Sequence, residues 1–95
     1  MLIETPYKVG DTVSLKLTSG EEVIARLEEE KDDAYVLHKP MALVAGQQGI
    51  GMAPFMFSVA HDGKYNLQSR AVTCIAKTAK ELASQYVEQT TGIKV

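Results

Sequence analysis

The sequence predicts a small, mainly β domain: a bent five-stranded antiparallel barrel followed by a C-terminal α-helix. In residues 13–40, apolar and polar side chains alternate in three runs separated by polar turns. Further alternating runs follow between residues 55 and 76. From Ala79 onward the apolar spacing becomes that of an amphipathic helix. The 95 residues predict a single domain, with the barrel at about 12–76 and the helix at about 77–91.

Three strands are expected at the start of the barrel. Residues 13–17 and 23–27 alternate with period two, each with one buried and one wet face. Ile24 places an apolar side chain on the face expected to be wet, so part of that face should be covered. The six charged residues 28–33 mark a solvated turn, and a third strand is expected at 34–39.

The middle of the chain is rich in glycine and proline. Pro40 is expected to end the third strand or to lie at an edge, with 41–45 as a possible continuation past a kink. The segment 46–54 is expected to be a flexible connection. A phosphate loop is disfavoured because no Lys-Ser/Thr pair follows its last glycine. An exposed tip at 50–52 that contacts a neighbouring chain stays open.

Two more strands and a hairpin are expected before the helix. Residues 55–60 alternate again and predict a strand. The sequence 61–64, His-Asp-Gly-Lys, is typical of a tight hairpin turn. Residues 65–67 would lead out of that turn, and 71–76 would form the last strand.

The C-terminal helix is predicted from apolar side chains at helical spacing, which are Ala79, Leu82, Ala83, Tyr86 and Val87. Thr78 and Glu81 have the spacing of a capping box, and Gly92 stands where a helix would stop. The helix is expected to close one end of the barrel, with packing against a neighbouring subunit as the alternative. Its polar face is mixed in charge, unlike that of a membrane-surface helix.

Composition limits the classes of function. The net charge of −2 means that nucleic-acid binding would have to be local, or repeated in an oligomer, rather than rest on a basic excess. Two histidines and one cysteine are too few for a usual metal site. The sequence contains no constellation of nucleophile and base, so we expect no cofactor, no metal and no enzymatic activity.

Cysteine usage and hydropathy bear on location. Cys74 lies within a strand pattern and is expected to be a small buried residue, and a lone cysteine fits a reducing compartment. No apolar stretch is long enough for a membrane span. The N-terminal stretch is too short and too acidic for a signal peptide. A soluble cytoplasmic protein is therefore expected.

Residues 13–40 resemble the first sequence motif of Sm-like (LSm) proteins, in which a strongly bent second strand and an acidic turn precede the third strand. Tyr35 stands where that motif has an aromatic residue, whereas Ala25 replaces the usual Gly of the bend and Val36 the usual Asn. The segment 69–75 resembles the shorter second motif, a basic residue followed by β-branched ones. Together these segments cover about half of the chain. A trailing helix in place of the usual leading one is a further departure.

The resemblance implies a cyclic homo-oligomer of about five to seven subunits that binds single-stranded RNA. In the family the fourth strand of one subunit pairs with the fifth of the next, so the seam would join 71–76 to 55–59 or to 65–67. Base stacking would fall to Tyr35, and the basic contact with base or phosphate to Arg70. Weaker candidates for RNA binding are Gln68, Ser69 and Lys39.

The resemblance leaves a second function open, a structural or protein-interaction ring with no nucleic-acid role. The acidic balance and the absence of Asn at Val36 favour it, and the carboxylates of 28–33 would repel phosphate. Divergent Sm-like domains are also proposed for viral genomes, which would place a phage-type member in the cytoplasm of an infected host.

Overall fold

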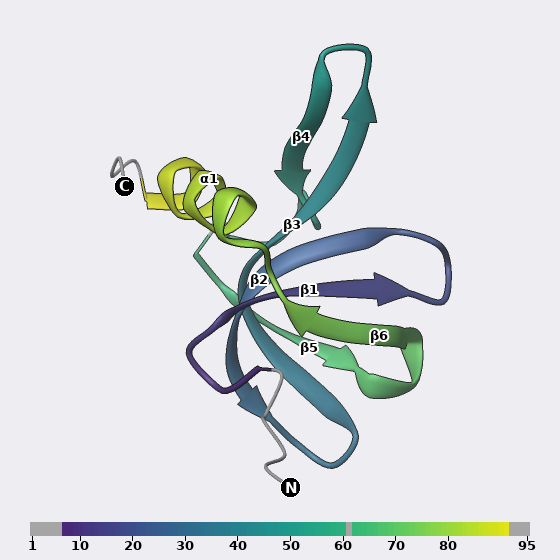
Figure 1. Cartoon of the computed structure of the whole chain (residues 1–95). Helices are drawn as coiled ribbons and strands as arrows, with labels where there is room; N and C mark the ends of the chain where they lie inside the picture. Colours follow the sequence, from purple (N-terminus) through teal and green to yellow (C-terminus); the bar gives the residue numbers. More distant parts are fainter. Residues whose placement is uncertain (1–6, 61, 92–95) are drawn as a thin grey trace, which may run out of the picture.

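The computed structural model describes residues 7–60 and 62–91, which form an antiparallel sheet of six strands and one C-terminal helix (Figure 1). The elements in chain order are β1 (Thr12–Leu17), β2 (Glu22–Glu30), β3 (Ala34–Gly46), β4 (Gly49–Pro54), β5 (Lys64–Gln68), the short 3-10 helix η1 (Ser69–Ala71), β6 (Val72–Lys77) and α1 (Lys80–Thr91). The mainly β architecture, the three-strand meander and the trailing helix predicted from the sequence are confirmed.

The sheet curls but does not close into a barrel. Its strands follow the order β4-β3-β2-β1-β6, and β5 pairs separately with β3. Within the described residues, no ladder joins β5 to β6. The expected bent five-stranded barrel is therefore replaced by an open, bent six-stranded sheet, because β3 is long enough to pair with two different strands along one edge.

Strand β3 pairs with both β5 and β4 along the edge that faces away from β2. Its first half pairs with β5, from Ala34 opposite Gln68 to His38 opposite Lys64. Its second half pairs with β4, where Met41 is the partner of Pro54. Segment 55–63, in which residue 61 is not described, leaves the sheet between these two ladders. The continuation of the third strand past Pro40 is thus confirmed, and the strand bends there instead of ending.

The bend in β3 is a local irregularity of the ladder with β2. Ile24 pairs with Met41 and Arg26 with His38, so the single residue Ala25 faces both Lys39 and Pro40. Lys39 has a φ of 53°, which L-residues rarely adopt in a strand. This extra residue re-aims the second half of β3 away from the rest of the sheet (Figure 1).

Two predictions for the middle of the chain are wrong. The glycine-rich segment 46–54 is not a flexible connection but the turn and outgoing strand of the β3–β4 hairpin, in which Gly49 takes a φ of +116°. Residues 55–60 form turns and bends instead of a strand. Both edge positions along β3 are taken by β4 and β5, so the alternating residues 55–60 find no partner. The hairpin expected at 61–64 therefore lacks its first strand, and His61 lies outside the described residues.

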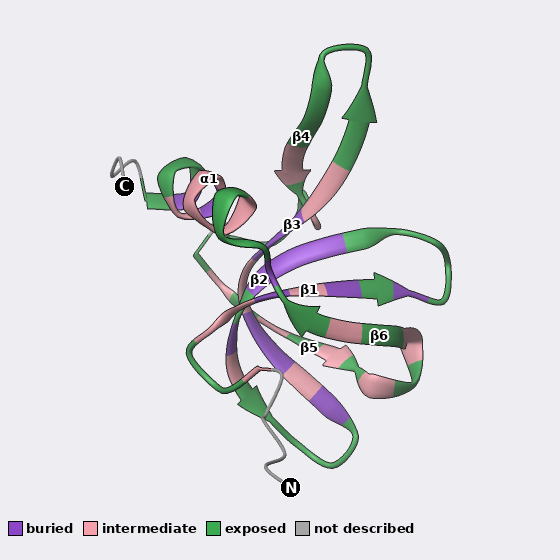
Figure 2. Cartoon of the chain, in the orientation of Figure 1, coloured by how far each residue is buried: buried purple, intermediate pink, exposed green. Residues whose placement is uncertain are grey.

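The core lies within the curl of the sheet (Figure 2). Its members come from alternating positions of the meander, as predicted, and are Val13, Leu15, Leu17, Val23, Ala25, Leu27 and Leu37. On β6 the side chains packed against this core are Val72 and Ile75. Cys74 therefore faces outward and is exposed, so the prediction of a buried cysteine is wrong.

Helix α1 packs on the opposite face of the sheet. A second cluster joins Ile24, Met41 and Tyr86, which confirms that an element covers the apolar Ile24. The helix thus covers a face of the sheet rather than one end of a barrel. It begins at Lys80, later than predicted, and the Thr78 hydroxyl lies 2.8 Å from Ser14 Oγ, which ties the start of the helix to β1.

Candidate nucleic-acid interface

The turn between β2 and β3 carries the first predicted site residue, Tyr35. This side chain is half-buried and packs against the core. Tyr35 lies directly across from Glu30 of β2 and from Leu67 of β5. Directly opposed residues in a sheet project from the same face. Tyr35 is thus flanked by a carboxylate on one side and an apolar side chain on the other.

Tyr7 joins this group from the N-terminal segment. Its hydroxyl donates a hydrogen bond to Glu30 Oε1 at 2.8 Å. Burial, and then the neighbouring Glu30 and Tyr35, raise the pKa of the Tyr7 phenol well above its ordinary value. The hydroxyl is therefore protonated at neutral pH and available as a donor to the carboxylate.

The segment that carries Arg70 lies beside the same turn. Gln68 is the strand partner of Ala34, and the backbone N–H of Ser69 donates to the Asp33 carbonyl at 2.9 Å. Arg70 is exposed and forms no ion pair with any residue that the structure describes. The structure thus brings Tyr35, Gln68, Ser69 and Arg70 to one end of the sheet.

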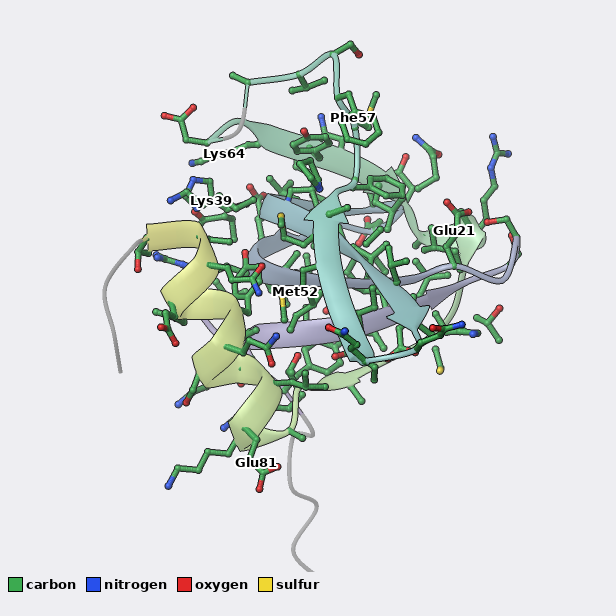
Figure 3. All side chains as sticks on the ribbon, turned by 90° about the horizontal axis from the view of Figure 1, so that it is seen from above. Glu21, Lys39, Met52, Phe57, Lys64 and Glu81 are labelled. Atoms are coloured by element: carbon green, nitrogen blue, oxygen red, sulfur yellow. The ribbon has the colours of Figure 1, made fainter. Side chains whose placement is uncertain are left out.

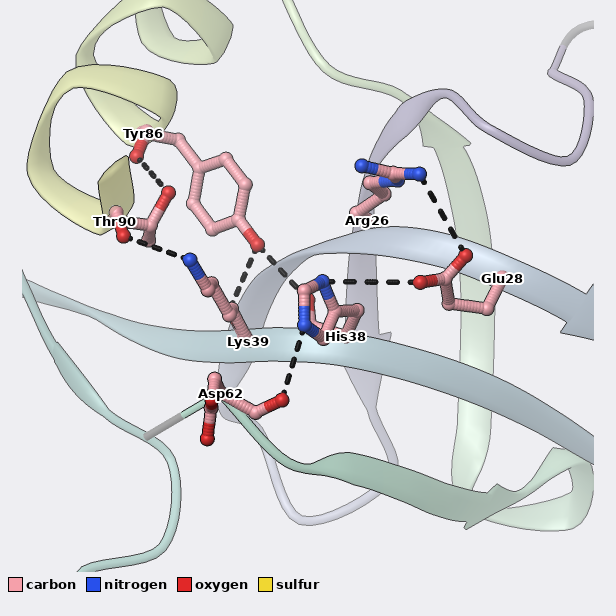
Figure 4. A network of polar contacts seen from close by, with 7 residues as sticks. All are labelled: Arg26, Glu28, His38, Lys39, Asp62, Tyr86 and Thr90. Atoms are coloured by element: carbon pink, nitrogen blue, oxygen red, sulfur yellow. Dashed lines mark hydrogen bonds and ion pairs between the residues drawn. The ribbon is translucent and has the colours of Figure 1, made fainter. Parts of the chain in front are cut away.

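Lys39 does not belong to this group. It lies beside α1 (Figures 3 and 4), where its Nζ donates to the Thr90 carbonyl at 2.9 Å. The last carbonyls of a helix have no partner within the helix, and a cation there is favoured by the helix dipole. Lys39 is therefore placed to stabilise α1 rather than to contact a ligand at Tyr35.

Polar contacts around His38 hold segment 55–63 near β3 (Figure 4). His38 Nε2 lies 3.0 Å from the Asp62 carbonyl, which can only accept, so Nε2 carries the proton. On the other side of the ring, Nδ1 lies 3.8 Å from Glu28 Oε1, and Arg26 approaches the same carboxylate at 3.9 Å. The Glu28 carboxylate is therefore directed toward Arg26 and His38.

Charge around Tyr35 is mainly negative. The exposed carboxylates next to it are Glu29, Glu30, Asp32 and Asp33. The β2–β3 turn and the segment that carries Arg70 contribute one basic residue each to this region, which are Lys31 and Arg70. Phosphate groups would be repelled here, so any affinity for nucleic acid must come from stacking and base contacts more than from phosphate contacts.

Sequence reasoning missed Tyr7 and Glu30 as site residues. Tyr7 precedes the first strand, and its position depends on long-range backbone hydrogen bonds, from Gly10 N–H to the Leu27 carbonyl and from Leu27 N–H to the Asp11 carbonyl. The only available signal was a single aromatic residue ahead of the first predicted strand. Glu30 was treated as one of a run of solvated charges, and only the ladder with Tyr35 distinguishes it.

Exposed apolar side chains also occur in two other places, the β3–β4 hairpin and segment 55–63. Val44 and Ile50 project from the β3–β4 hairpin, each about half exposed. Met56, Phe57 and Val59 project from segment 55–63, and Phe57 is 86% exposed (Figure 3). These three residues line a shallow groove together with Pro40, Pro54 and Tyr65. We call the three exposed side chains of Met56, Phe57 and Val59, which line this groove, the apolar patch.

A metal-binding cluster and a membrane-spanning helix are both absent from the described residues. No three His, Cys, Asp or Glu side chains there converge in a way that could hold a metal ion. In residues 7–60 and 62–91, no helix is both long and apolar enough to cross a bilayer.

Neither a protein-family description nor a curated protein matches this sequence. The fold and the geometry around Tyr35 are therefore the grounds on which a function can be assigned.

Proposed function

We propose that this chain is a non-enzymatic Sm-like protein that forms a homo-oligomeric ring and binds single-stranded RNA. The observation that carries the proposal is the contact between its two motif-like segments. The Ser69 N–H donates to the Asp33 carbonyl, so Tyr35 and Arg70 come to the same end of the sheet although they are far apart in the sequence. These are the two residues to which the resemblance assigns base stacking and the basic contact.

The strand arrangement supports an Sm-like assignment. A three-strand meander is bent by ladder irregularities in β2 and β3, and the last strand returns to pair with β1. The short helix η1 connects β5 to β6. Ala25, which stands where the family has Gly, lies at the irregularity beside Lys39, so β3 supplies the bend with its own extra residue.

Unpaired strand edges support self-association. In the described part of the chain β6 pairs only with β1, while β4 and β5 pair only with β3. An open edge exposes backbone donors and acceptors that favour pairing with another chain. Pairing of β6 of one subunit with β4 or β5 of the next would satisfy these edges and generate a closed ring.

RNA binding would rest on weak contacts repeated around the ring. A base stacked on an aromatic side chain contributes roughly 1–3 kcal/mol, and repetition multiplies such sites. Arg70 would supply the local positive charge that the net charge of −2 does not. Because only one cation per subunit would contact phosphate at this site, salt should weaken binding modestly.

Fluorescence anisotropy with U-rich and A-rich RNA oligonucleotides, at low and at physiological salt, tests the proposal. Wild type should bind in the micromolar range, and Tyr35→Ala and Arg70→Ala should each abolish this binding. Lys16→Ala is a matched control for Arg70→Ala, since it removes one exposed positive charge from β1 without touching the site. Absence of binding at low salt would reject the RNA proposal.

A ring used for protein interaction, without RNA, is the second candidate. The apolar patch favours it, because exposed apolar side chains that lie together, as Met56, Phe57 and Val59 do around one groove, are typical of a contact surface. The two candidates differ in outcome: the second requires an assembled ring that binds no RNA at low salt.

A further inference from the structure

We propose that Glu30, oriented by Tyr7, makes the site at Tyr35 prefer bases that carry an exocyclic amino group and disfavour uracil. This inference rests on the proposed RNA binding and adds a base preference to it. The resemblance would predict a base contact by Asn, but this chain has Val36 at that position. Glu30 is the polar side chain that the fold places next to Tyr35 instead.

The geometry brings Glu30 to the edge of a stacked base. Glu30 and Tyr35 are direct cross-strand partners, so their Cβ atoms lie about 4.5–5.5 Å apart on the same face. A base resting on the exposed part of the Tyr35 ring would therefore direct its hydrogen-bonding edge toward the carboxylate.

Tyr7 fixes the carboxylate in one orientation. Its hydroxyl donates to Glu30 Oε1 at 2.8 Å, and no other side chain among the described residues binds Glu30. The second oxygen, Oε2, accepts no hydrogen bond from the described residues and is left as an acceptor. A held acceptor loses less conformational entropy on binding than a freely rotating side chain would.

A carboxylate accepts hydrogen bonds but donates none. The amino groups of cytosine, adenine and guanine can donate to it, and contact between an acidic side chain and cytosine N4 is an established form of base recognition. Uracil has a carbonyl oxygen at the equivalent position, and two acceptors facing each other repel. The Asn of the family's motif has both a donor and an acceptor, so replacing its role with Glu30 should change the preference rather than merely weaken it.

Cytosine and uracil are the best pair of ligands for the test. Both are pyrimidines, so they stack similarly, and they differ at the position that Glu30 would contact. We would measure the dissociation constants of wild type for labelled oligo-C and oligo-U of equal length by anisotropy, near neutral pH. The oligo-C complex should be tighter by about fivefold or more.

Glu30→Gln should bring the ratio of the two constants close to one, because an amide offers a donor to uracil as well as an acceptor to cytosine. Tyr7→Phe should reduce the ratio in part, since the carboxylate would keep its chemistry but lose its orientation. Glu29→Gln is the matched control: it removes the same charge from the adjacent exposed residue, which projects from the opposite face. It should tighten both complexes equally and leave the ratio unchanged.

Each outcome separates the two proposals. Equal affinity of wild type for oligo-C and oligo-U would overturn the base preference and leave RNA binding intact. A preference for cytosine that persists in Glu30→Gln would also overturn the role of Glu30. Binding to neither oligonucleotide at low salt would overturn the proposed function itself, and the base preference with it. Circular dichroism and a melting curve for each variant identify any loss of binding that comes from misfolding.

Discussion

The hydroxyl of Tyr86 lies 2.9 Å from the carbonyl oxygen of His38 and 2.8 Å from that of Lys39. In a regular strand successive carbonyls point in opposite directions, so one donor could not reach both. The left-handed backbone of Lys39 turns the two carbonyls to the same side, and the buried Tyr86 hydroxyl satisfies them with a shared hydrogen bond. One residue of α1 thereby holds the bend that divides β3.

Tyr86→Phe should destabilise the protein by about 1–2 kcal/mol, because it leaves two carbonyl groups under the helix without their donor. Urea denaturation followed by circular dichroism measures this difference. Tyr65→Phe is the matched control, since Tyr65 is half-buried and its hydroxyl has no hydrogen bond within the described structure. A loss for Tyr65→Phe as large as for Tyr86→Phe would contradict this account of the bend.

Stability should fall between about pH 10 and pH 12. Burial raises the pKa of Tyr86 from 10.0 to about 12, against the smaller opposing effect of Arg26. A tyrosine whose pKa is raised by folding binds its proton more tightly in the native state, so its contribution is complete below pH 10 and is lost as the pH rises through 12. Tyr7 shifts in the same direction.

Urea midpoints between pH 8 and pH 12.5, with tyrosinate absorbance recorded in parallel, would follow this loss from about two pH units below the unfolded pKa of 10.0 to just above the folded one. Tyr86→Phe should show a shallower decline than wild type, because the contribution of the Tyr86 phenol is removed. Identical slopes for the two proteins would contradict the assignment to Tyr86.

Lys39→Gly should be more stable than Lys39→Ala by about 1 kcal/mol, since glycine adopts a φ of 53° without the steric cost that alanine retains. Both variants lose the hydrogen bond from Nζ to Thr90, so their difference isolates the backbone effect. Thermal or urea denaturation compares them directly. Neither variant should lower RNA affinity as Arg70→Ala does, because Lys39 lies at α1 and away from Tyr35.

Phe57→Ser should leave the free energy of unfolding within about 0.5 kcal/mol of wild type, because this side chain is 86% exposed and contributes little to the core. If pairing of strand edges closes the ring, Phe57→Ser should also leave the oligomer intact. Its mass by light scattering should then be the same multiple of the subunit mass as in wild type. A fall to smaller species would show instead that segment 55–63 lies in the subunit interface.

The local pattern of the sequence was sufficient for much of the fold. The period-two runs of β1, β2 and the first half of β3 are confirmed, and so is the covering of Ile24. These features follow from alternation of apolar and polar side chains, which depends only on neighbouring residues. The strand predicted at 55–60 failed because alternation says nothing about whether a partner edge is free.

The candidate site was predictable only in part. Tyr35 and Arg70 were chosen by resemblance, and the ladder between β3 and β5 places their segments together. Lys39 was chosen on the same grounds and lies elsewhere, because the bend at its own backbone turns it toward α1. Tyr7 could not be chosen, since its contact with Glu30 joins residues that no local pattern connects.

By itself, the sequence determined that this chain forms a bent meander with one apolar face and an amphipathic trailing helix, because side-chain periodicity decides which faces must leave water. Only the tertiary structure decided that the sheet stays open, that Cys74 faces outward and that Glu30 stands beside Tyr35. These features depend on which strand edges meet, and long-range pairing is set by competition among edges rather than by any one segment.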